Sequence, residues 1–91
     1  MGTYIKYVID GSKFTDRDAA FKYLNSIFNF PDYQGENLDA LWDTLTLKDK
    51  TEIEIISARK IYENLGDYGI KFLYLFGDLD RYEQFDIYFR W

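Results

Sequence analysis

The sequence predicts an α/β domain in which a small three-stranded parallel sheet packs against about four helices. Three short segments, residues 4–10, 51–56 and 85–89, are rich in the β-branched and aromatic side chains typical of strands. The intervals between them leave room for the crossover helices that parallel strands require. Because the chain has 91 residues, 47% of them hydrophobic and 21% aromatic, we expect residues 1–91 to form a single domain.

Residues at the end of the first strand and at the start of the first helix indicate where these elements lie. Residues 4–10 stop at Gly11, which is typical of the end of a strand. Thr15 followed by Asp18 resembles a capping pair, so we expect a helix over residues 16–28. Its apolar stripe is predicted to consist of one of two alanines and three larger residues, namely Ala19 or Ala20, Tyr23, Leu24 and Ile27.

Residues 31–46, with the sequence PDYQGENLDALWDTLT, predict a loop followed by a short helix that ends near Thr46. Pro31 is expected to end the segment that follows the predicted helix over residues 16–28, and Gly35 permits a backbone turn. Asn37 is a good N-cap because its side chain can accept hydrogen bonds from backbone N–H groups of the first turn. Four apolar residues then recur at the spacing of one buried helical stripe, namely Leu38, Leu41, Trp42 and Leu45.

The second half of the chain contains two further strands and a short helix. After a polar turn at residues 48–50, apolar and polar side chains alternate over residues 51–56, which predicts a strand with its glutamates on a solvated face. Ser57 is placed to cap a helix through about residue 63, and residues 64–66 break it. Residues 85–89 predict the last strand.

Local propensity and topology disagree over residues 70–76. Their composition is strand-like, and Gly69 and Gly77 each weaken a helix by about 1 kcal/mol, so propensity alone predicts a strand. A helix after a possible Asp67 cap would instead bridge the second and third strands as parallel pairing requires. We expect the helix.

Negative charge is concentrated in residues 31–46, which contain four of the 16 acids and none of the 11 bases. The rest of the chain is almost neutral. The formal net charge is −5 and the pI is about 4.5. These values disfavour nucleic-acid binding, which requires a basic surface, and favour a basic protein partner.

Several residue types that enzymes and metal sites commonly use are absent. The chain has no cysteine and no histidine, which excludes a disulfide framework, a thiolate nucleophile and the commonest general base. We expect no catalytic residue, no metal and no cofactor. There is no signal-like segment, and no apolar run approaches the ~18 residues of a membrane span. We therefore expect a cytoplasmic protein that binds no membrane and is monomeric when free.

Two aspartates of the predicted acidic helix are candidates for a binding site. Asp39 lies in the first turn, where the helix dipole stabilises a carboxylate by roughly 0.3–1 kcal/mol. Asp43 lies on the same exposed side four residues later, where a like charge costs about 0.2–0.5 kcal/mol. Tyr33 and Trp42 flank these acids and would give rigid contact area, although Trp42 can also pack in the core. Structural and functional interpretations of these residues both remain open.

The segment PDYQGENLDALWDTLT resembles the signature of the barstar family, the intracellular inhibitors of barnase-type ribonucleases. The rest of the chain resembles the family more loosely. The resemblance implies a barstar-like fold with a helix over residues 70–76. It also implies that Asp43 occupies the phosphate-binding centre of a ribonuclease and that Asp39 is a second interfacial acid. The other implied partner-binding residues are Tyr33, Asn37, Leu38, Trp42 and, in the long helix, Asp78, with Asp80 as its alternative.

The resemblance implies inhibition of a basic secreted-type ribonuclease by an acidic helix and loop that mimic phosphate, as in a toxin–antitoxin or immunity pair. Glu36 matches the signature but is not expected to touch the enzyme. Leu47 and Lys48 depart from the pattern, in which an aromatic residue often extends the contact. This departure leaves the partner's identity open.

Two other functions are considered. The chain could be a barstar-like immunity or regulatory protein that binds a different toxin or protein partner. It could also be a glycosidase-like enzyme with Asp39 and Asp43 as its acid–base pair. The enzyme is disfavoured because both aspartates share one exposed helical face with no evident pocket.

Overall fold

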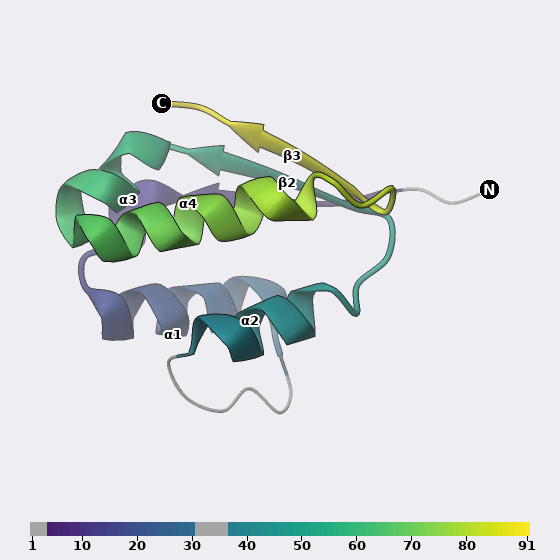
Figure 1. The fold of residues 1–91 in the computed structure, drawn as a ribbon, viewed down its shortest axis with the longest axis horizontal. Coiled ribbons are helices and arrows are strands. Elements are labelled where there is room, and N and C mark those ends of the chain that lie inside the picture. Colours follow the sequence, from purple (N-terminus) through teal and green to yellow (C-terminus); the bar gives the residue numbers. More distant parts are fainter. Residues whose placement is uncertain (1–3, 31–36) are drawn as a thin grey trace.

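The computed structural model describes residues 4–30 and 37–91 (Figure 1). Its strands form one parallel sheet in the order β1-β2-β3, and α1 and α2 lie side by side beneath the sheet and α4. The predicted three-stranded parallel α/β fold is confirmed. In chain order the elements are β1 (Ile5–Asp10), the short 3-10 helix η1 (Gly11–Lys13), α1 (Arg17–Phe28), α2 (Leu38–Leu45), β2 (Thr51–Ile56), α3 (Ala58–Leu65), α4 (Asp67–Leu79) and β3 (Phe85–Phe89).

The sheet has a buried face and a charged face. Side chains on the buried face include Ile9, Ile53, Ile55, Phe85 and Ile87. On the other face, which we call the outer sheet face, Lys6, Glu52, Glu54 and Arg90 form ion pairs across all three strands. The predicted glutamate face is therefore ion-paired rather than simply solvated.

Glu54 is the centre of these ion pairs. Its carboxylate accepts a hydrogen bond from Arg90 and lies 3.3 Å from Lys6 Nζ. The hydrogen bond from Arg90, followed by that from Lys6, holds the pKa of Glu54 below its usual value of 4.5. Only 16% of the Glu54 side chain is exposed, and both cations lie against its carboxylate.

The first helix is capped by Asp16, and the prediction that Thr15 and Asp18 form the capping pair is wrong. The Asp16 backbone is extended, and its Oδ1 accepts a hydrogen bond from the Ala19 N–H at 2.8 Å. A carboxylate at this position satisfies one of the unpaired donors of the first turn. Asp18 instead pairs with Lys22, four residues later, at 2.9 Å.

The caps of α3 and α4 also differ from those predicted. Ser57 occupies the N-cap position of α3, but its backbone is left-handed (φ 50°) and its side chain makes no capping hydrogen bond. Asp67 is the first residue of α4 rather than its cap, a position that Gly66 takes. A φ of 60° at Gly66 lets the chain turn sharply between the two helices.

Residues 70–76 lie within α4, so the expected helix is confirmed and the strand favoured by propensity is wrong. Phe72, Phe76 and Leu79 of α4 are fully buried, and their spacing fits one helical face. Gly69 serves the contact between α3 and α4, because a Cβ there would lie 2.3 Å from the Ile61 carbonyl oxygen. Close packing with α3 therefore explains a glycine that weakens the helix in isolation.

The buried face of α1 is wider than the predicted stripe. Its buried residues are Ala20, Phe21, Leu24 and Phe28, whereas Tyr23 and Ile27 are half-buried. Phe28 contacts Tyr7 of β1 with ring centroids 4.7 Å apart, and Phe21 contacts Phe72 of α4 at 5.2 Å. Because α1 packs against both the sheet and α4, it buries more than one narrow stripe. Within the described ranges, no helix combines the length and hydropathy needed to cross a membrane.

Candidate functional site

Helix α2 forms as its sequence predicts. Asn37 Oδ1 accepts hydrogen bonds from the N–H groups of Asp39 at 2.7 Å and Ala40 at 3.3 Å, so Asn37 is confirmed as the N-cap. Leu41 and Leu45 are fully buried, whereas Leu38 and Trp42 are half-buried. The buried stripe fixes the helix and leaves Asp39 and Asp43 exposed on its outside.

A groove between α2 and α4 brings four of the predicted site residues together. It has a volume of about 280 Å³ and is lined by Leu38, Asp39 and Trp42 of α2 and by Lys71, Tyr74, Leu75 and Asp78 of α4. We call it the α2–α4 groove. Asp43 and Asn37 are exposed on α2 but do not line the groove. Tyr33 lies outside the described residues, as does Glu36.

The acids around the groove share it with a base, Lys71. Among the described residues, no ion pair involves Asp39, Asp43 or Asp78. Lys71 lines the groove, yet its Nζ lies 5.8 Å from the centroid of the Tyr68 ring, as in a cation–π contact. The three carboxylates therefore present negative charge on two packed helices.

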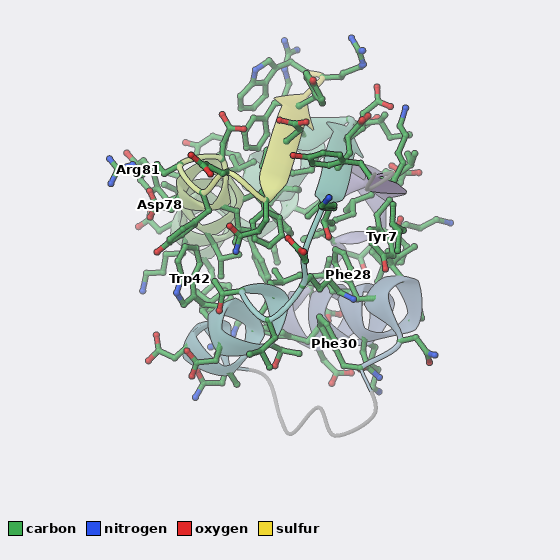
Figure 2. The ribbon with its side chains drawn as sticks, turned by 90° about the vertical axis from the view of Figure 1, so that its right-hand side faces the viewer. Tyr7, Phe28, Phe30, Trp42, Asp78 and Arg81 are labelled. Carbon is green, nitrogen blue, oxygen red and sulfur yellow. The ribbon has the colours of Figure 1, made fainter. Side chains whose placement is uncertain are left out.

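Trp42 has both a packing role and an accessible surface. Its ring lies 5.9 Å from that of Tyr82, and its side chain is half-buried against the core. Figure 2 shows Trp42 below Asp78 and Arg81 on one side of the molecule, with Tyr7, Phe28 and Phe30 on the other. Trp42 thus connects the core to the groove.

Asp78 and Asp80 have different environments. Asp78 is exposed and lines the groove. The Asp80 carboxylate instead accepts a hydrogen bond from the Ile87 N–H at 3.1 Å, which ties the end of α4 to β3. This contact gives Asp80 a structural role and leaves Asp78 as the α4 acid beside α2.

Three groove residues were not anticipated from the sequence. They are Lys71, Tyr74 and Leu75. Together with Asp78 they have the spacing i, i+3, i+4 and i+7, which places them on one side of α4. That pattern lies within the helix expected from the sequence, but the sequence does not show which side of the helix faces α2.

Lys48 is directed toward aromatic rings of the core. Its Nζ lies 5.3 Å from the ring centroid of Tyr7, 5.7 Å from that of Phe28 and 5.6 Å from that of Phe30. It also lies 3.5 Å from Tyr7 Oη. These contacts stabilise the cation locally and explain why a lysine follows α2 in this chain.

The described residues contain no group of three or more acidic side chains that could together hold a metal ion. The groove carries the carboxylates of Asp39 and Asp78 beside the rings of Trp42 and Tyr74. Such a surface can accept hydrogen bonds from the guanidinium and ammonium groups of a protein partner.

Comparisons with known proteins support this interpretation of the fold and signature. The family model described as "Barstar (barnase inhibitor)" matches residues 5–90. A protein of Bacillus subtilis (strain 168) named "Putative ribonuclease inhibitor YrdF" is 49% identical over 41 residues. That alignment covers 45% of this chain and 45% of the relative, so it spans less than half of either protein. Because the family model covers nearly the whole domain, the chain belongs to the barstar family.

Proposed function

We propose that this protein inhibits a basic barnase-type ribonuclease by inserting α2 into the phosphate-binding part of its active site. The observation that carries the proposal is the set of exposed carboxylates on α2 and α4, Asp39, Asp43 and Asp78, which form no ion pair among the described residues. In this proposal Asp43 is the central acid, and the other two contact basic side chains around it.

The chemistry of a ribonuclease explains why such acids would bind it. Its active site must hold phosphate oxygens, so it presents arginine, lysine and histidine donors. A carboxylate on a rigid helix can accept charge-assisted hydrogen bonds from the same donors. At a separation of ~4 Å and an effective dielectric constant near 20, one pair contributes about 4 kcal/mol of gross Coulomb energy before desolvation.

The remaining predicted residues have supporting roles in the proposal. The Asn37 cap fixes the start of α2, while Leu38 and Trp42 give apolar contact area beside the acids. Tyr33 is proposed as a loop contact from its place in the family signature alone. The family match and the name of the Bacillus relative support a ribonuclease as the partner.

In this proposal the protein acts by binding its partner and not by catalysis. An acid–base pair needs two carboxylates in different environments, whereas Asp39 and Asp43 are both exposed on one side of α2. We propose a cytoplasmic inhibitor that is monomeric when free and forms an immunity pair with its enzyme. The alternative is binding to a different toxin or protein partner.

Competition with substrate tests the proposal. If α2 occupies the phosphate-binding centre, inhibition of a barnase-type ribonuclease should be competitive with RNA. A mononucleotide should weaken the apparent affinity of the inhibitor in titration calorimetry, because both require the same donors. Asp86→Asn is the matched control for Asp43→Asn, since Asp86 is an exposed acid of β3 remote from α2. The Asp86→Asn variant should inhibit like the unmodified protein.

Two results would contradict the proposal. Independent binding of inhibitor and mononucleotide would show that the phosphate-binding centre is free in the complex. Failure to bind barnase-type ribonucleases, combined with capture of an unrelated basic toxin, would favour the alternative partner.

A further inference from the structure

A second hollow lies on the opposite flank of α4 from the α2–α4 groove. We call it the α4–β3 pocket; it has a volume of about 280 Å³ and is lined by Ile70, Leu73, Tyr74, Phe89 and Trp91. Figure 1 shows α4 between β3 and α2. Tyr74 lines both hollows, so the groove and the pocket are neighbours that share one exposed side chain as a wall.

The walls of the pocket are suited to an apolar group. None of the side chains that line it is charged. Tyr74 is 71% exposed and Trp91 66% exposed, so two large aromatic rings face solvent at its rim. The pocket is smaller than the roughly 300–1,000 Å³ typical of small-molecule sites. A hollow of this volume, open to solvent and walled by aromatic and aliphatic side chains, has room for an apolar side chain of a protein partner.

We propose that the α4–β3 pocket receives an apolar side chain of the same basic ribonuclease whose active site receives α2. This inference rests on the proposed function. Because Tyr74 lines both hollows, a partner that contacts this side chain would reach both, with charged contacts in the groove and an apolar contact in the pocket. Tryptophan and tyrosine are enriched among the residues that dominate binding energy at protein interfaces.

Charge argues against a second copy of this chain as the occupant. The protein has a net charge of −5, and the groove on the other flank of α4 is lined by Asp39 and Asp78, which form no ion pair among the described residues. A symmetric contact through α4 would bring the two acidic grooves toward each other, which is unfavourable. A basic partner meets no such repulsion.

Alanine substitutions at the pocket test the inference. Binding of a catalytically inactivated barnase-type ribonuclease would be measured for Trp91→Ala and Tyr74→Ala, at low and at physiological salt. Trp91→Ala should accelerate dissociation about tenfold, an effect within the range found when an aromatic contact is truncated at a protein interface. Because the contact is apolar, this ratio should be the same at both salt concentrations, and the association rate should not change. Tyr74→Ala should have a larger effect, since both hollows lose a wall.

Tyr62→Ala is the matched control, because Tyr62 is 51% exposed on α3 and lines neither hollow. It should dissociate like the unmodified protein. Unchanged dissociation of Trp91→Ala and Tyr74→Ala, together with weakened binding of Asp43→Asn, would overturn the pocket proposal and leave the proposed function intact. Failure of the unmodified protein to bind the enzyme would overturn both. A dimer of the free protein in sedimentation, abolished by Trp91→Ala, would assign the pocket to a second copy instead.

Discussion

The acids of the outer sheet face and the exposed acids of α2 and α4, which we call the α2–α4 surface, differ in whether they form ion pairs. On the outer sheet face, Glu54 is paired with both Lys6 and Arg90. On the α2–α4 surface, Asp39, Asp43 and Asp78 form no ion pair among the described residues. Paired charges are satisfied within the domain, whereas unpaired carboxylates on a packed helix repel each other and are satisfied only by solvent or a partner. The comparison therefore separates charges that support the fold from charges available for binding.

The largest effect that tests this comparison is expected at Asp43. Replacing Asp43 by alanine should weaken ribonuclease binding by about 2–5 kcal/mol, the range usual when one partner of a buried charge pair is removed. The thermal midpoint should stay unchanged or rise slightly, because the substitution relieves repulsion from Asp39. Inhibition assays and thermal unfolding would measure the two effects. A midpoint that falls by many degrees would assign Asp43 to the fold instead.

A second test compares the two neighbouring acids at the end of α4. Asp78→Ala should weaken binding without changing stability, because Asp78 lines the groove and has no ion pair among the described residues. Asp80→Ala should lower the free energy of unfolding by about 1 kcal/mol, since it removes the acceptor of the Ile87 N–H. Urea unfolding and binding kinetics would distinguish the two variants. The reverse result would show that the acid beside α2 is Asp80.

A smaller effect is expected from Trp42→Phe. Phenylalanine should keep most of the contact with Tyr82, so the thermal midpoint should change little. Dissociation of the ribonuclease should accelerate a few-fold if the outer edge of the indole contacts the enzyme. Surface plasmon resonance would measure the rate. An unchanged dissociation rate would place Trp42 in the core alone.

The smallest effect concerns Glu54 and pH. Its folded-state pKa lies below the usual 4.5 because of Arg90 and then Lys6. Its contribution to stability is therefore present above about pH 4.5 and is lost as the pH falls through the lower, folded-state pKa. In Glu54→Gln, thermal unfolding between pH 6 and pH 3 should show a smaller loss of stability on acidification than in the unmodified protein. Ribonuclease binding at neutral pH should be the same in both. Weakened binding would contradict the separation of the two charged regions.

The local sequence was sufficient to predict an element wherever neighbouring residues determine its geometry. The strands over residues 51–56 and 85–89 followed from alternation and β-branched or aromatic composition, and their bounds agree with the structure. Helix α2 followed from the Asn37 cap and its apolar stripe. The acids of α2 were visible as a charge imbalance in one segment. In each case the deciding interactions lie within a few residues of each other along the chain.

Tertiary structure decided what depends on residues far apart in sequence. Residues 70–76 have strand-like composition, yet they form a helix because α4 buries Phe72 and Phe76 in the core and Gly69 fits closely against α3. Asp78 and Asp80 are alike in sequence, and only the contact of Asp80 with β3 separates them. The groove, and the place of Tyr74 between it and the α4–β3 pocket, exist only once α2, α4 and β3 are packed together. Propensity reports the preference of each segment alone, whereas burial against distant segments contributes more free energy and overrides it.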